Sequence, residues 1–254
     1  MIYIFLPAYN EEVALPRLVE KFDETFKRDH ESYRIVVLDD GSSDGTHAAA
    51  LKLAERYPMT VLRHEVNRGL GQTMIDGLAH CAAISASNDL IVTLDCDDTH
   101  EPKYVHSAIA KIHEGYDLVI LSRYQTGGGE MGLSLVKSIL SRGAGLFLKL
   151  FFPIKGVHEY SCGYRVFRSL ALKSAFLTMG PKFVELPHMG FVVTPEILIK
   201  FRMLGFRIAE VPFVLNYGQK PGLSKNKPLK TIMGYFHLVL RCWGRRVTRV
   251  GTIA

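Results

Sequence analysis

Three carboxylates that lie close together are the residues of this sequence best suited to chemistry. Asp95, Asp97 and Asp98 directly follow a run from Asp89 to Leu94, whose β-branched and apolar residues predict a buried strand. Open α/β sheets bind ligands at the carboxyl ends of their strands. If the chain turns immediately after this strand, Asp95 and Asp97 can both reach one divalent cation. Taken alone, the same residues are also typical of a solvated turn.

The segments around this acidic turn predict a repeated order of strand, polar turn and helix. Pro7 is expected to end the first strand, and Asn10 to cap a helix that runs to about Arg28. Five strands that alternate with helices predict an α/β fold with a mainly parallel sheet and with its polar turns on one edge. The expected strands cover 2–6, 34–38, 59–64, 89–94 and 117–121, and the later helices end near 57, 85 and 114.

Composition and missing motifs exclude several classes of protein. The chain has 254 residues, of which 48% are hydrophobic, so it can bury a sizeable core. Its four cysteines form no CxxC pair, which indicates neither structural zinc nor a disulfide framework and favours a reducing compartment. No signal peptide is visible. The chain also lacks the glycine-rich fingerprints of dehydrogenases and of P-loop enzymes.

Positive charge is concentrated at the end of the chain. From Val211 onward there are eight Lys and Arg residues and no acidic residue. Subtracting these eight from the net charge of +6 leaves −2 for residues 1–210. Such a segment attracts phosphates, acidic headgroups or nucleic acid, and its interleaved apolar residues favour a membrane surface. We expect no nucleic-acid partner, because the sequence contains no recognised nucleic-acid module.

The polar turns together carry a family resemblance. Pro7-Ala8-Tyr9-Asn10-Glu11, Asp39-Asp40-Gly41-Ser42, Asp44-Gly45-Thr46, Asn67-Arg68-Gly69 and Asp95-Cys96-Asp97 resemble the ordered motifs of family 2 glycosyltransferases with the GT-A fold. The resemblance implies that a sugar is transferred from a GDP- or UDP-linked donor with inversion, assisted by Mg²⁺ or Mn²⁺. It implies nucleotide contacts from Pro7, Ala8, Tyr9, Glu11, Asp39, Asp40, Arg68 and Asp95, and cation contacts from Asp95 and Asp97.

The role of Asp97 at the cation and diphosphate makes it a predicted catalytic residue, whereas Asp98 is expected to be structural. Thr99 stands where relatives usually carry Gln, and its hydroxyl is a further candidate metal ligand. A cation that bridges the diphosphate stabilises the negative charge that develops on the leaving group.

The second half resembles the branch of the family that uses a polyprenyl phosphate, either dolichyl or undecaprenyl, as acceptor. The resemblance rests on 159–167, 194–196, 205–212 and 222–225. A phosphate oxygen is already a nucleophile at neutral pH, so the acceptor site needs cations more than a general base. Arg123, Arg142 and Lys225 are the candidates, with Arg123 also a predicted catalytic residue, although each could be an ordinary solvent-facing cation. Gln219 stands where relatives often carry Arg. Lys220 beside it is a cation, but it lacks the planar guanidinium through which Arg binds a phosphate with two hydrogen bonds.

Two apolar segments predict contact with a membrane. Residues 131–154 predict one or two interfacial helices, although a core helix fits the same pattern. Residues 229–243 predict an amphipathic helix too short to cross a bilayer. We therefore expect a catalytic domain over 1–227 and a basic helix and tail over 228–254. The expected location is peripheral, on the cytoplasmic face of an anionic membrane.

Two other functions fit part of the sequence. A transferase with the same donor could act on a hydroxyl of a soluble glycan or a protein, but it would need a general base that the sequence does not clearly offer. A non-catalytic nucleotide-binding protein at the membrane surface is the other alternative, and intact Asp95 and Asp97 argue against it. The sequence leaves the oligomeric state open.

Overall fold

A computed structural model describes residues 1–28, 30–219 and 228–245 of the chain. The described helices are α1 Ala14–Arg28, α2 Thr46–Ala54, α3 Leu70–Ile84, α4 Val105–His113, α5 Leu135–Phe151, α6 Ser169–Met179, α7 Val193–Met203 and α8 Pro228–Cys242, with short 3₁₀ helices η1 Pro102–Tyr104, η2 Gly180–Lys182, η3 Pro187–Val192 and η4 Tyr217–Gln219. The strands are β1 Ile2–Ala8, β2 Tyr33–Asp39, β3 Met59–Arg63, β4 Leu90–Thr93, β5 Leu118–Ser122, β6 Gly129–Met131, β7 Arg165–Arg168, β8 Ile208–Pro212 and β9 Val214–Asn216.

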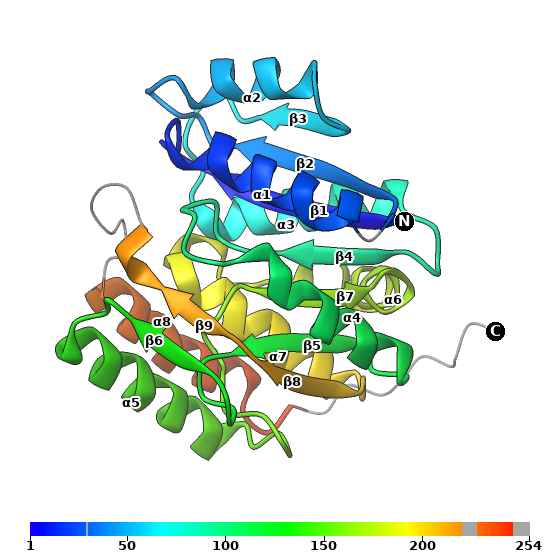
Figure 1. Cartoon of the computed structure of the whole chain (residues 1–254). Helices are drawn as coiled ribbons and strands as arrows, with labels where there is room; N and C mark the ends of the chain where they lie inside the picture. Colours follow the sequence, from blue (N-terminus) through cyan, green and yellow to red (C-terminus); the bar gives the residue numbers. More distant parts are fainter. Residues whose placement is uncertain (29, 220–227, 246–254) are drawn as a thin grey trace.

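A seven-stranded sheet forms the centre of the molecule, with the order β3-β2-β1-β4-β7-β5-β8 (Figure 1). Every neighbouring pair is parallel except the two that include β7, which runs antiparallel between β4 and β5. The prediction of a mainly parallel α/β sheet is therefore confirmed, and all five predicted strands are present. The sequence analysis missed β7, β8 and the small parallel sheet of β6 and β9.

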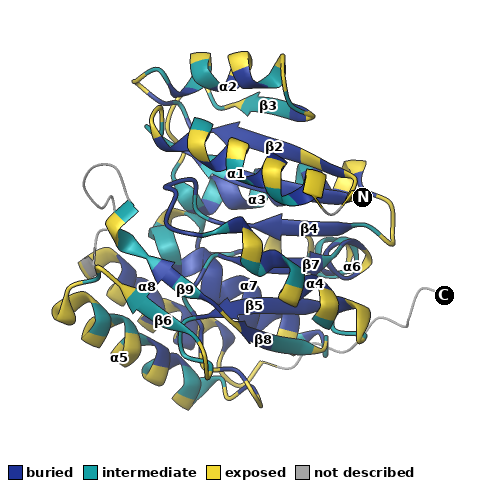
Figure 2. Cartoon of the chain, viewed as in Figure 1, coloured by how far each residue is buried: buried dark blue, intermediate teal, exposed yellow. Residues whose placement is uncertain are grey.

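Alternating side chains on the central strands divide the core into two layers. On β1, Tyr3 and Phe5 pack on the face covered by α3, α6 and α7, whereas Ile4 and Leu6 pack on the face covered by α1, α2 and α4. Successive side chains of a strand point to opposite faces, so a strand covered on both faces has to be apolar throughout. This explains why the central strands appear buried along their length in Figure 2.

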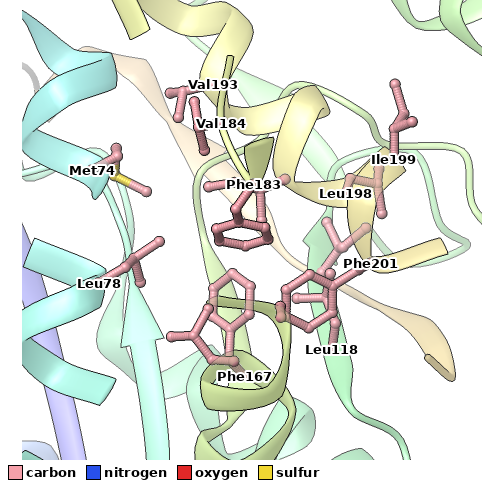
Figure 3. Close-up of a cluster of buried hydrophobic side chains, with 14 of the residues drawn as sticks. Met74, Leu78, Leu118, Phe167, Phe183, Val184, Val193, Leu198, Ile199 and Phe201 are labelled. Carbon is pink, nitrogen blue, oxygen red and sulfur yellow. The ribbon is translucent and has the colours of Figure 1, made fainter. Parts of the chain in front are cut away.

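Aromatic rings fill the layer between the sheet and α7. Phe167 of β7 and Phe183 both lie against Phe201 of α7, with ring centroids 5.4 and 6.1 Å from it (Figure 3). Edge-on and tilted ring pairs at these distances stabilise a core beyond the area that they bury. The same cluster includes Tyr235 and Leu238 of α8. One face of α8 is thus part of the core.

The start of the first helix differs from the prediction. Pro7 lies inside β1, because β4 pairs with β1 only as far as Phe5 and a residue without an N–H is tolerated beyond that point. Asn10 has a left-handed backbone, with φ 52°, and α1 begins only at Ala14. Asn10 is therefore not the helix cap. It lies in a turn that contacts the next loop.

The segment 131–154 contains one helix, α5, so the prediction of one or two helices is resolved in favour of one. The predicted C-terminal helix is confirmed as α8. Phe147 of α5 lies 5.0 Å from Phe236 of α8, measured between ring centroids, so the two helices are in contact. Among the described helices, none combines the length and apolar character needed to cross a membrane.

Candidate active site

The turns after β1 and β2 lie side by side and are joined by hydrogen bonds. The N–H of Asp40 donates to the carbonyl oxygen of Ala8 at 2.8 Å. The N–H of Asn10 donates to the hydroxyl of Ser42 at 2.9 Å, and the N–H of Glu11 donates to the hydroxyl of Thr46 at 2.7 Å. The structure therefore brings together the two motifs that the sequence analysis assigned to the nucleotide, at the sheet edge where parallel α/β folds bind ligands.

Asp39 is completely buried at the end of β2. Its Oδ1 accepts a hydrogen bond from the N–H of Ser42 at 3.0 Å, which shapes the turn. Its Oδ2 lies 3.4 Å from Nε of Arg63 and 3.5 Å from Nδ1 of His47. A carboxylate at a strand end with one oxygen in such loose contacts can still accept a hydrogen bond from a ligand.

Asp40 holds the next loop in place. Its Oδ1 accepts from the N–H of Arg68 at 2.9 Å and contacts Nδ1 of His64 at 2.7 Å, and its Oδ2 accepts from the N–H of Gly69 at 2.8 Å. The guanidinium of Arg68 extends outward and donates to Asp76 at 3.0 Å. Asp40 thus holds the loop of Arg68 beside the turns after β1 and β2. Direct nucleotide contacts from Asp40 and Arg68 stay predictions.

The acidic turn after β4 forms at the same edge, as predicted from its sequence. Asp97 is buried, and its Oδ1 accepts hydrogen bonds from the hydroxyl of Thr99 at 2.6 Å and from the N–H of Thr99 at 3.3 Å. Asp95 is half-buried, and Gly163 lies beside it so closely that a Cβ there would be 3.3 Å from Oδ1 of Asp95. In this structure the Thr99 hydroxyl therefore orients Asp97. Its role as a metal ligand stays a prediction.

Asp98 has a structural role, in agreement with the expectation. It is a buried residue with φ 60°, a backbone conformation that few residues other than glycine adopt. Nζ of Lys21 on α1 lies 2.8 Å from Oδ1 of Asp98 and 2.9 Å from Glu101. Burial lowers the pKa of Lys21, but hydrogen bonds to these two carboxylates outweigh that effect and raise it. Lys21 thus fastens the turn that carries Asp97 to α1.

The donor set suits a cation that is shared with a substrate. Among the residues that the structure describes, no three His, Cys, Asp or Glu side chains are grouped closely enough to hold a metal ion by themselves. Mg²⁺ is usually bound through one or two carboxylates plus substrate phosphates, with waters completing its octahedron. Asp95 and Asp97 fit that pattern, and the absence of a side chain at Gly163 leaves room beside Asp95.

Arg123, predicted to grip the acceptor phosphate, is engaged by protein groups. Its Nε and Nη2 donate to the two oxygens of Glu159 at 2.7 and 2.9 Å, and its Nη1 donates to Glu130 at 3.0 Å. Nη2 also lies 3.2 Å from the hydroxyls of Ser141 and Ser161. Burial lowers the pKa of Arg123, but the charge and hydrogen bonds of Glu159 outweigh it and raise the pKa. Arg123 therefore links β5 to α5, and its contact with an acceptor stays a prediction.

Arg142 on α5 lies beside this cluster. Its guanidinium stacks over the ring of Tyr124 at 5.3 Å, and that of Arg123 lies 4.9 Å from the same ring. Burial raises the pKa of Tyr124 to about 12, against the opposing effect of Arg123, so its hydroxyl keeps its proton. Lys225 lies outside the described residues. Of the three predicted acceptor cations, Arg123 and Arg142 are thus brought together around Tyr124.

Several residues that organise the site were not predicted from the sequence. His64, Glu130 and Ser141 contact predicted site residues that lie 7 to 24 positions away along the chain, and Lys21 contacts Asp98 in the acidic turn, 77 positions away. None belongs to a motif, and only the fold makes them neighbours. Glu159, the first residue of the segment 159–167, is the buried counter-ion of Arg123.

Comparisons with known proteins agree with this arrangement. Residues 3–176 match the model of the glycosyl transferase family 2. The chain is 30% identical over 252 residues to a dolichol-phosphate mannosyltransferase of Pyrococcus furiosus, covering 98% of this chain and 66% of that protein. It is 27% identical over 224 residues to a polyprenol monophosphomannose synthase of Mycolicibacterium smegmatis, covering 87% of this chain and 79% of that protein.

Solved structures show the same fold. Glucosyl-3-phosphoglycerate synthase of Mycobacterium tuberculosis superposes with a TM-score of 0.64 at 21% identity, covering 99% of this chain and 84% of that one. Its complex with Mn²⁺, UDP-glucose and phosphoglyceric acid superposes with a TM-score of 0.63 at 19% identity, covering 94% and 79%. At this identity the likeness concerns the fold, which is the predicted GT-A arrangement.

Proposed function

The chain belongs to glycosyltransferase family 2, and from that premise we propose that it transfers a sugar from a nucleotide donor to a polyprenyl phosphate. One observation carries the donor half of the proposal. The turns after β1, β2 and β4 meet at one sheet edge, with Asp39 and Asp97 buried there and Asp95 half-buried beside them. Both named relatives are, by their names, enzymes of polyprenol or dolichol phosphates, which supports the acceptor half. The chain spans slightly less than two thirds of the first of these relatives.

The nucleoside is assigned to the turns after β1 and β2, with Arg68 at its edge. Pro7, Ala8 and Tyr9 form one wall, and Asp39 offers an oxygen from the other. Hydrogen bonds between the two turns keep this wall in place before a ligand arrives, which reduces the entropy lost on binding. Glu11 belongs to the same turn, since its N–H binds Thr46. The base, guanine or uracil, is left open.

Asp95 and Asp97 would hold Mg²⁺ or Mn²⁺ together with the donor diphosphate. When bound, the cation neutralises charge that develops on the leaving diphosphate. Thr99 contributes by directing one oxygen of Asp97, and Lys21 contributes by holding Asp98 in its left-handed conformation. These contacts fix the carboxylates before the donor binds, as electrostatic catalysis requires.

The chemical step proposed here needs no protein base. An anionic oxygen of the acceptor phosphate forms the new bond to the anomeric carbon, while the bond from that carbon to the donor diphosphate breaks. The nucleoside diphosphate leaves with the electron pair of the broken bond, so the configuration at the carbon is inverted. Arg142, Lys225 and Arg123 are the proposed acceptor cations, and Arg142 is the most exposed of those described, because Arg123 is enclosed by Glu159 and Glu130.

Helix α5 supports the membrane half of the proposal, because its polar side faces the protein. Ser138 donates to Glu130 at 2.6 Å, Ser141 contacts Arg123, and Lys137 donates to the hydroxyl of Tyr217 at 3.2 Å. Most of its large apolar side chains instead face outward, with Leu135, Val136, Ile139, Leu140, Leu146 and Leu150 between 51% and 81% exposed, whereas Leu148 is completely buried. A surface helix normally has the opposite orientation. This face therefore requires an apolar environment outside the protein.

Helix α8 extends the same apolar surface. Leu229, Met233, Phe236, Leu240 and Trp243 are all more than half exposed, and Trp243 packs edge-on against Phe151 of α5 at 6.1 Å. Figure 1 shows both helices on one side of the molecule. We propose that 1–227 is a catalytic body, that α5 and α8 lie in the headgroup region of an anionic membrane, and that the membrane face is cytoplasmic.

Turnover tests the enzymatic proposal directly. The protein is incubated with a panel of GDP- and UDP-sugars, with Mg²⁺ or Mn²⁺, with and without a polyprenyl phosphate, and release of nucleoside diphosphate is measured. We expect release with one donor, only when both the lipid and the cation are present. Release that is independent of lipid would reject the lipid acceptor and favour a hydroxyl acceptor, and full activity in chelator would reject the cation assignment.

Co-sedimentation with vesicles tests the membrane proposal. The double variant Leu146→Gln and Leu240→Gln removes one apolar side chain from each helix, and each costs about 1.5 to 3 kcal/mol of burial, so binding is expected to fall by at least about a hundredfold. Leu177→Gln is the matched control, because Leu177 is 76% exposed on α6. Equal loss in the control, or binding that does not depend on anionic lipid, would contradict the proposal.

A further inference from the structure

A cavity of about 210 Å³ lies between the start of α3, η3 and the start of α8. Three side chains in its lining are basic or become cationic on protonation: Arg68, His188 and Lys230. Among the residues that the structure describes, no Asp or Glu side chain lines it. Concave sites lined by one sign of charge concentrate the opposite charge. The cavity is therefore suited to an anion, and neither Arg123 nor Arg142 lines it.

Two of these three side chains have no polar partner among the residues that the structure describes. Arg68 pairs with Asp76, whose carboxylate is shared with His64 and Gln72. Neither Lys230 nor His188 forms a hydrogen bond or ion pair with any residue that the structure describes. The positive end of α3 adds to the field at Gly69, where the helix has no side-chain cap. Within the described part of the chain, the unpaired lysine thus lies on the α8 side of the cavity and the unpaired histidine on η3.

Two close contacts fix the walls of the cavity. A Cβ at Gly71 would overlap the carbonyl oxygen of Pro187, so α3 lies directly against η3. A Cβ at Gly234 would overlap Cγ2 of Val192, so α8 also lies directly against η3. Because glycine permits both approaches, the three walls form one rigid unit. The cavity is thus preformed, as ligand sites commonly are.

The surroundings of the cavity indicate the chemical class of the ligand. Beside Lys230, Leu229 is 80% exposed and Met233 is 57% exposed, on the apolar surface shared by α5 and α8. At the other wall, Arg68 belongs to the loop that Asp40 holds against the donor turns. A ligand that satisfies both ends has an anionic head and an apolar tail.

We propose that this cavity binds the phosphate head of a membrane lipid, with the lipid tail lying along the exposed face of α8. The proposal rests on the membrane docking proposed above and adds a second phosphate site to the acceptor cations near Tyr124. The phosphate could belong to a bulk phospholipid or to the polyprenyl phosphate acceptor, since both present the same group. Lys230 and His188 would bind it, with Arg68 on the donor side.

Direct titration tests the site without requiring turnover. Octyl phosphate, below its micelle concentration, is titrated into the full chain, into Lys230→Gln, and into Lys230→Gln combined with His188→Gln. One lysine near a lipid phosphate contributes about a fivefold change in affinity, so the dissociation constant should rise roughly fivefold in the first variant and further in the second. Lys52→Gln, an equal loss of charge on the exposed side of α2, should leave it unchanged. Inorganic phosphate should bind at least about tenfold more weakly than octyl phosphate, because it lacks a chain.

Two further measurements identify the source of the phosphate. Weaker binding of Lys230→Gln to phosphatidylcholine vesicles that contain phosphatidylglycerol assigns the site to bulk phospholipid, whereas a raised KM for polyprenyl phosphate assigns it to the acceptor. Unchanged octyl phosphate affinity in both variants, or equal affinity for inorganic phosphate, would overturn the proposal. A raised KM for the nucleotide sugar alone would overturn it too, by assigning the cavity to the donor. If the protein failed to use any polyprenyl phosphate, the octyl phosphate result would still stand on its own.

Discussion

Replacing Glu159 by Gln is expected to destabilise the protein strongly, because it breaks a buried ion pair. Glu159 is completely buried, and its two oxygens accept hydrogen bonds from Nε and Nη2 of Arg123. The same carboxylate accepts from the N–H groups of Ser161 and Cys162. Gln keeps the shape of the side chain but turns an NH₂ group toward the guanidinium. Arg123 then becomes a buried charge whose closest carboxylate is gone.

The structure allows the size of this loss to be worked out. Breaking a buried pair by removing one partner costs about 3 to 5 kcal/mol, and the Arg123 side chain, only 9% exposed, has little access to water that would screen it. Glu130 remains 3.0 Å from Nη1 and keeps the loss near the lower end of that range. A change of 1 kcal/mol shifts the melting temperature by about 2 to 4 °C in a domain of this size. The expected decrease is therefore roughly 6 to 12 °C.

Urea and thermal unfolding of Glu159→Gln, Arg123→Met and the double variant measure the prediction. The double variant should lose less than the sum of the single variants, by at least about 1.5 kcal/mol, because the second substitution removes the unpaired charge. Glu114→Gln is the control, since it breaks an exposed ion pair with Lys111 on the surface of α4 and should leave stability almost unchanged. A loss below about 1 kcal/mol in Glu159→Gln, or strict additivity in the cycle, would refute the account of this pair.

Three further outcomes follow from the site. Asp97→Asn should reduce kcat by at least about a hundredfold while the melting temperature changes little, because a bound cation supplies several kcal/mol of transition-state charge stabilisation. Steady-state turnover measures the first effect and thermal unfolding the second. Near-normal turnover would show that the cation lies elsewhere. Gly163→Ala should raise the Mg²⁺ or Mn²⁺ concentration needed for half-maximal activity, since the added Cβ would lie 3.3 Å from Oδ1 of Asp95 and displace that carboxylate. An unchanged metal titration would contradict the placement of the cation beside Asp95. Burial raises the pKa of Glu159, but Arg123 outweighs it and holds the pKa below the ordinary 4.5, so the stability from this carboxylate is complete above pH 4.5 and is lost as the pH falls through the lower folded value. Urea unfolding between pH 7 and 3 should show a steeper loss in the native protein than in Glu159→Gln, and parallel curves would contradict this.

The sequence alone was sufficient for strands β1 to β5 of the central sheet and for the edge where the proposed donor site lies. Strands that are buried on both faces are largely apolar, and β1, β4 and β5 show this in their composition, as does β2 apart from the exposed Arg34 and the terminal Asp39. Because parallel strands end at one edge, the polar turns that follow them had to converge.

The sequence was insufficient where a segment takes its structure from distant neighbours. Strand β7 has only four residues and pairs antiparallel with β4 and β5, so no local sequence pattern predicted it. Proline often ends a strand. Pro7, however, lies beyond the last residue of β1 that pairs with β4, so it is tolerated within β1. In both cases strand pairing outweighed local preference.

Only the tertiary structure decided what the charged residues of the second half do. Arg123 was identified from the sequence as a cation at a strand end. No local sequence pattern showed that its guanidinium would pair with Glu159, 36 positions later. Periodicity showed that α5 is amphipathic, yet it could not say which face would be turned outward. That choice depends on Glu130 and Arg123, which bind Ser138 and Ser141 of α5 and leave most of its leucines exposed. Hydrogen bonds to buried charges require donor and acceptor at short distance and in a defined geometry, so they can be identified only in the folded structure.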